Sequence, residues 1–200
     1  SNHELSPRYY FYITFSYPLL FYSTKIAEGS SEIAIFNVET KEKPGFASPF
    51  MFPKTAIVDP KILITVPQRV TAVTGFDILC HTVEGYVSKV SHPICEILNE
   101  RAMQYVIKYL PVALKDSENI EARGYLAFAN ILAGISLTHS RATLLHAIEH
   151  PLSGYYNITH AEGLAALFPK WLEFSYDGAL KKFKTIGNFF GLSGTENTKE

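Results

Sequence analysis

The pattern of apolar and polar positions changes character at Pro67. Before it, short aromatic and β-branched runs such as residues 10–17, and alternating positions such as residues 33–37, are separated by turn-forming residues. This pattern is typical of short strands and loops. After it, apolar residues recur at intervals of three and four, the spacing of a helix face. We therefore predict a strand-and-loop segment over residues 1–66 and a helical bundle over residues 67–200.

Local signals predict where the helices begin and end. One helix is expected over residues 76–87, after a Thr-Gly pair that interrupts the periodic pattern, and another over residues 93–111, bounded by a proline at each end. A long Ala-rich helix is expected over residues 120–138. A shorter helix is expected to end at His150, because Pro151 disfavours helical geometry at the residue before it.

Composition and charge narrow the class of protein. The chain has 200 residues, 47% of them hydrophobic, which is enough to bury one good core. Its 18 basic and 19 acidic residues nearly cancel and are scattered, so we expect no nucleic-acid partner. The apolar stretch over residues 9–22 is short and interrupted by polar residues, so we expect no membrane span. The chain has two cysteines, Cys80 and Cys95, and no secretory leader, so we expect a cytoplasmic protein with reduced thiols.

Five side chains are candidates for metal chemistry. Asp77 and His81 are four residues apart, as are His146 and His150, so on helices each pair shares one face; His160 follows ten residues later. A carboxylate with imidazoles suits Zn(II) or Fe(II) better than Mg(II) or Ca(II). Alternatively, the aspartate stabilises a helix start and each histidine is an ordinary core or surface residue. The clustering of three histidines in apolar sequence favours the metal site, because burying unpartnered imidazoles is costly.

Two sequence motifs carry a resemblance to a known family. Residues 71–86 read TAVTGFDILCHTVEGY and resemble the signature TA-x-TG-x-D-x-L-x-H-x-x-E-x-Y of the iron-containing (group III) alcohol dehydrogenases. Residues 146–152 read HAIEHPL and, with His160, resemble the family's second motif, H-x-x-x-H-P-L followed by H-G. The resemblance extends over about residues 13–194. It implies a mainly α fold, the helical domain of a dehydroquinate synthase-like protein, with a small N-terminal β and loop remnant of an α/β nucleotide-binding domain.

The resemblance also implies roles for individual residues. The family's metal ligands match Asp77, His81, His146 and His160, with Fe(II) or Zn(II) as the cation. His150 matches an additional histidine near the metal and is a candidate catalytic proton relay. The alternative for His150 is a helix-terminal histidine held by a neighbouring carbonyl group.

The implied activity is a metal-dependent alcohol dehydrogenase that interconverts an alcohol and an aldehyde by hydride transfer with NAD or NADP. A homo-oligomer is expected because the family usually assembles. Gly29, Ser30 and Ser31 occupy the place of a cofactor-binding turn, although they could equally form a simple loop. The chain contains no Gly-Gly-Gly-Ser phosphate-binding loop, so we interpret it as a fragment. A non-catalytic metal-binding or scaffold remnant is the alternative function, and a metal hydrolase is a weaker one.

Three positions need a structural test. Ala161 replaces a glycine of the family, and Arg141 lies in a turn where the family has a glycine, so a β-carbon at either position would matter if the backbone there needs positive φ. Arg141 would also place a charge near the cation unless it turns to solvent. Glu84, one turn after His81, could orient that imidazole or could simply be a carboxylate on the helix face.

Overall fold

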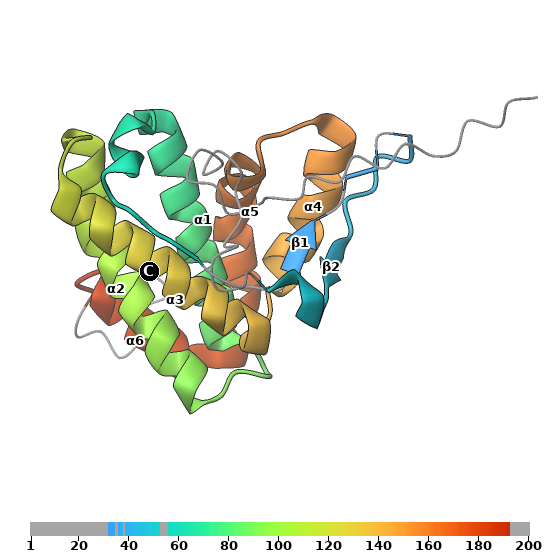
Figure 1. Ribbon diagram of the computed structural model, residues 1–200. Helices are drawn as coiled ribbons and strands as arrows, with labels where there is room; N and C mark the ends of the chain where they lie inside the picture. The colour runs from blue at the N-terminus through green and yellow to red at the C-terminus, as the bar shows by residue number, and fades with distance from the viewer. Residues whose placement is uncertain (1–31, 35, 38, 53–55, 193–200) are drawn as a thin grey trace, which may run out of the picture.

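The computed structural model describes residues 32–34, 36–37, 39–52 and 56–192. Most of the described chain is helical, which confirms the predicted fold class (Figure 1). The segment over residues 10–17 and the candidate cofactor residues Gly29, Ser30 and Ser31 lie outside the described residues. The helices are α1 (Gln68–Val87), α2 (Pro93–Lys115), α3 (Ile120–Ser140), α4 (Leu144–Tyr156), α5 (His160–Ser175) and α6 (Leu180–Phe189).

Two short strands precede the helices. β1 (Glu32–Ala34) and β2 (Gly45–Ala47) pair antiparallel, beside α4 (Figure 1). The turn between the two strands is built around Asn37 and lies before Gly45. The side-chain oxygen of Asn37 accepts hydrogen bonds from the backbone N–H groups of Glu39, at 2.9 Å, and Thr40, at 3.2 Å. Such a side-chain-stabilised turn satisfies the backbone locally and leaves Gly45 free to begin a strand.

The first helix is longer than the pattern predicts. α1 runs through the Thr-Gly pair without a break. The Thr74 hydroxyl donates to the carbonyl of Val70 at 2.7 Å, so this threonine remains inside the helix. A β-carbon at Gly75 would lie 2.5 Å from the Leu110 side chain of α2. Gly75 therefore permits close helix packing rather than ending a helix.

Prolines also fail to end two of the helices. α2 continues four residues past Pro111, and α4 continues five residues past Pro151, so both predicted ends are wrong. In each case the turn that follows the proline is packed: Ala113 is fully buried, and Gly154 lies against the backbone of Lys41. Packing of that turn outweighs the single backbone hydrogen bond that each proline removes.

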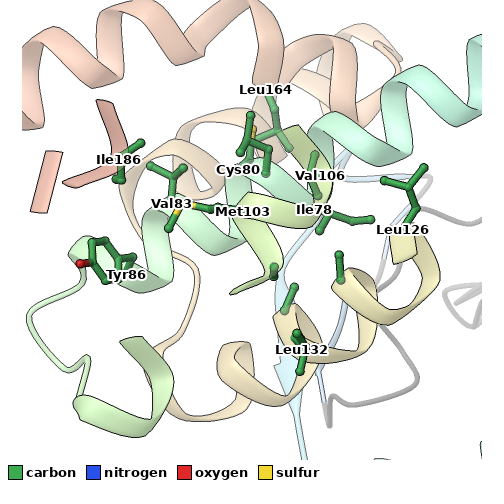
Figure 2. Close-up of a cluster of buried hydrophobic side chains, with 14 of the residues drawn as sticks. Ile78, Cys80, Val83, Tyr86, Met103, Val106, Leu126, Leu132, Leu164 and Ile186 are labelled. Atoms are coloured by element: carbon green, nitrogen blue, oxygen red, sulfur yellow. The ribbon is translucent and has the colours of Figure 1, made fainter. Parts of the chain in front are cut away.

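The core forms where α1 packs against α2 and α3 on one side and α5 on the other. Met103 and Leu164 are completely buried in it, and Cys80 is likewise buried, which identifies it as a core thiol (Figure 2). Because α1 is covered on both sides, the face of α1 toward α5 can carry polar residues that are shielded from water. Among the described residues, no helix combines the length and apolar character needed to cross a bilayer.

Candidate metal centre

Three imidazoles converge on one carboxylate oxygen. The Nε2 atoms of His81, His146 and His160 lie 3.5, 3.6 and 3.8 Å from Asp77 Oδ1. Asp77 and His81 come from α1, His146 from α4 and His160 from the first residue of α5. In Figure 1, α5 lies between α1 and α4. The structure thus brings together all four predicted ligands, although they span 84 positions of the chain.

The geometry of these atoms fits a bound divalent cation. Ligand atoms about 2.0–2.1 Å from a tetrahedral metal are about 3.4 Å from one another, close to the three distances measured from Asp77 Oδ1. Donor atoms of Asp77, His146 and His160 also lie within 4.8 Å of one another, and His81 joins this group through its distance to Asp77. Asp77 Oδ1 and His146 Nε2 are buried and have no hydrogen-bond partner among the described residues. Buried polar atoms without partners are costly. A cation that both atoms coordinate would remove that cost, so the residues present fit the metal that the sequence implies.

Glu84 holds the His146 imidazole through the ring nitrogen that faces away from the centre. Its Oε2 contacts His146 Nδ1, and its Oε1 accepts hydrogen bonds from the N–H and hydroxyl groups of Thr143 and from the N–H of Leu145. The contact is with His146 and not with His81, so our expectation for its partner is wrong. A carboxylate on Nδ1 fixes the ring orientation and presents Nε2 to the centre.

Glu149 plays the same part for a second imidazole, and sequence reasoning missed it. Its Oε2 contacts His160 Nδ1, and the side chain is fully buried. A β-carbon at Gly163, one turn into α5, would lie 2.8 Å from Glu149 Oε1, so this glycine leaves room for the carboxylate. The available signal was an acidic residue between His146 and His150 in an otherwise apolar helix turn.

The loop between α4 and α5 positions His160. α4 is followed by Asn157, whose φ of 54° and ψ of 37° place it in the left-handed region, which asparagine tolerates better than most residues. The chain therefore reverses within three residues, and His160 begins α5 facing α4. His150 lies beside it, with ring centroids 5.3 Å from His160 and 6.1 Å from His146.

The charges of the centre depend on one another. Burial raises the pKa of Asp77, but the three histidines outweigh it and lower the pKa to about 2. Burial lowers the pKa of His146, but Asp77 and Glu84 raise it to about 9. Burial, with the neighbouring His146, keeps the pKa of His81 well below its usual value. The centre therefore combines ionised carboxylates with at least one imidazole that is neutral at neutral pH.

Comparison with known proteins shows the family of this chain. The sequence profile described as "Fe-containing alcohol dehydrogenase family, C-terminal" matches residues 71–200. The chain belongs to this family. The NADH-dependent butanol dehydrogenase A of Clostridium acetobutylicum is 37% identical over 197 residues, which cover 94% of this chain and 51% of that relative. The chain therefore spans about half the length of this relative.

Solved structures of an alcohol dehydrogenase and of an aldehyde reductase share the fold. An alcohol dehydrogenase of an archaeal halo-thermophile from a Red Sea brine pool has a TM-score of 0.82 and 38% identity, covering 86% of this chain and 44% of its own. The sulfoacetaldehyde reductase of Bifidobacterium kashiwanohense, solved with NAD+, has a TM-score of 0.71 and 27% identity, covering 86% and 51%. The helical architecture described here is thus that of the family.

Ala161 and Arg141, the two positions that the resemblance compares with glycines, differ in their backbone geometry. Ala161 is buried in the first turn of α5 and is not among the described residues with positive φ, so its β-carbon causes no backbone strain. Arg141 has φ 61° and ψ 154°, a region that is essentially reserved for glycine. Its side chain is exposed, so it turns to solvent rather than toward the centre.

We expect Arg141→Gly to stabilise the protein. Relief of about 1–3 kcal/mol of backbone strain should exceed the roughly 0.4–1 kcal/mol that a glycine costs through the unfolded chain. Urea denaturation should show an unfolding free energy higher by about 1 kcal/mol, with an unchanged slope. Gly191→Ala is the matched control, because Gly191 has φ 81° and should lose stability on gaining a β-carbon. A lower midpoint for Arg141→Gly would show that the turn is unstrained.

Proposed function

We propose that this chain is the metal-binding part of an NAD(P)-dependent dehydrogenase that interconverts a small alcohol and its aldehyde. The convergence of three imidazole nitrogens on Asp77 Oδ1 carries the proposal, and membership of the family supports it. We propose Asp77, His81, His146 and His160 as the ligands, with Fe(II) or Zn(II) as the cation. Cytoplasmic location, homo-oligomeric assembly and a domain boundary at residues 66 and 67 remain predictions.

The chemistry divides between the cation and the side chains. A divalent cation bound here would supply Lewis acidity toward the alcohol oxygen. Oxidation of the alcohol removes a hydride from the carbinol carbon and a proton from the hydroxyl group. The hydride passes to the nicotinamide ring. Burial, with the neighbouring His160 and Lys43, lowers the pKa of His150 to about 4, so a ring nitrogen of His150 is free to accept that proton. Glu84 and Glu149 hold His146 and His160 in orientation.

The test is turnover by the metal-loaded protein with NADH and butanal, the aldehyde of the alcohol in its relative's name. We expect metal-dependent NADH oxidation, and a fall in kcat of roughly 100-fold in His150→Ala, because the side chain that passes a proton to the aldehyde oxygen in this direction is lost. The metal content of this variant should be unchanged.

Other outcomes would favour the alternatives. A protein that binds metal but leaves NADH fluorescence unchanged would be a metal-binding scaffold rather than a dehydrogenase. Ester hydrolysis without any nicotinamide cofactor would indicate a metal hydrolase.

A further inference from the structure

The centre contains more buried negative charge than a divalent cation can neutralise. Asp77, Glu84 and Glu149 have 3, 0 and 0% of their surfaces exposed. Asp77 faces three imidazoles, and Glu84 and Glu149 each contact an imidazole Nδ1, so as partners of neutral metal-bound histidines these residues carry three negative charges. With a divalent cation bound and the imidazoles neutral as ligands, one negative charge remains. Buried charge without a counter-charge is strongly destabilising, so a further cation is expected nearby.

Lys43 supplies a cation at this place. Its Nζ donates a hydrogen bond to Ser153 Oγ at 2.9 Å. Ser153 lies four residues after Glu149 on α4, so the two side chains share one helix face. Lys43 is half-buried, and burial lowers its pKa, while attraction by Glu149 and Asp77 counters part of this shift. Lys43 makes no direct ion pair with either carboxylate, but its charge lies close enough to both to interact with them.

The backbone around Lys43 is held against the same helix. Lys41 has φ 63°, and its carbonyl oxygen would lie 2.2 Å from a β-carbon at Gly154. The close approach at Gly154 lets the connection between β1 and β2 rest on α4 (Figure 1). The packed backbone thus holds Lys43 beside α4, so the position of this lysine is fixed by the fold.

The two carboxylates behind the imidazoles differ in how their charge is compensated. Glu84 Oε1 accepts three hydrogen bonds, from Thr143 and Leu145. Glu149 Oε1 is buried and has no hydrogen-bond partner among the described residues. Hydrogen bonds to Oε1 stabilise the charge of Glu84, whereas the charge of Glu149 is stabilised first by His160, with Lys43 and Ser153 adding to it.

We propose that Lys43 and Glu149 form a charge-balancing pair that positions His160 and sets how tightly the centre holds a divalent cation. This inference rests on the metal site proposed above. Glu149 favours cation binding by holding the His160 ring and adding negative charge. Lys43 opposes it by adding positive charge, while keeping the buried carboxylate compensated. The two members of the pair therefore act on metal affinity in opposite directions.

Zinc titration of the metal-free chain, with a competing chelator dye, tests the pair. Glu149→Gln keeps an oxygen for His160 Nδ1 but loses the charge, and should bind Zn(II) roughly 10- to 100-fold more weakly than wild type. Lys43→Met should bind Zn(II) more tightly, on the order of tenfold, because a repelling charge is gone. The double variant restores the balance of charge and should bind with an affinity between those of the single variants. Glu173→Gln, on the exposed surface of α5, is the control and should match wild type.

The directions in which the two single variants change zinc affinity distinguish charge balance from simple packing. If Lys43 and Glu149 merely hold the fold together, both single variants weaken zinc binding and lower the urea midpoint in parallel, which would overturn the proposal. Unchanged affinity in Glu149→Gln would overturn it as well. A wild-type chain that binds no zinc would instead refute the metal site, so the two failures are distinguishable.

Discussion

The double variant His146→Ala, His160→Ala should lose stoichiometric metal binding. Structural zinc sites have apparent binding free energies of about 10–16 kcal/mol for four ligands, so removing two ligands should weaken binding by roughly 10⁴-fold or more. Elemental analysis of the protein purified without chelator should find about one metal per wild-type chain and almost none in the variant.

The control for this result is a histidine outside the centre. His139 is exposed near the end of α3 and contacts the ring of His92. His139→Ala should keep the metal of the wild type. Retention of metal by the double variant, or its loss in His139→Ala, would show that the cation is bound elsewhere.

Glu84→Ala should be among the most destabilising single substitutions in the chain. The carboxylate is fully buried and accepts hydrogen bonds from Thr143 and Leu145 while contacting His146. Its loss leaves buried donors without partners and removes the counter-charge of His146, so we expect a loss of about 3–5 kcal/mol. Urea unfolding of the metal-free proteins, with the exposed Glu173→Ala as control, measures the difference.

The effect of Glu84→Ala should also depend on pH. Although burial raises the pKa of Glu84, its contacts with His146, Thr143 and Leu145 lower it overall. A carboxylate with a lowered pKa stabilises the fold above its unfolded value of about 4.5, and this contribution disappears as the pH falls through the folded value. The gap between wild type and variant should therefore be full at pH 6 and narrow in strong acid. A gap that is constant over this range would mean that packing, not charge, accounts for the loss.

The sequence predicted the parts of the site that are close along the chain. Asp77 and His81 share a face because they are four apart on a helix, and the helical period was clear after Pro67. The contact of Glu149 with His160 depends on the left-handed Asn157 and on the room that Gly163 leaves, neither of which has a distinctive local pattern. Such features arise from tertiary packing, which a single sequence does not reveal.

Three predicted helix boundaries were wrong for the same reason, whereas the end at Val87 and the starts at Pro93 and Ile120 were right. Pro111, Pro151 and the Thr-Gly pair before Phe76 carry local signals that favour an end or interruption, but each lies within a helix that packing holds on both sides. Lys43 was missed because it reaches Ser153 across 110 positions of the chain. No periodicity connects two such residues.

X-ray absorption spectroscopy of the zinc-loaded chain tests the central claim most directly. The convergence on Asp77 Oδ1 predicts one zinc with three imidazole nitrogens and at least one carboxylate oxygen at about 2.0–2.2 Å, and with the multiple scattering of histidine rings. A sulfur shell near 2.3 Å, or a zinc with fewer than two imidazoles, would contradict it. Either result would mean that the four side chains meet in the fold without holding a metal together.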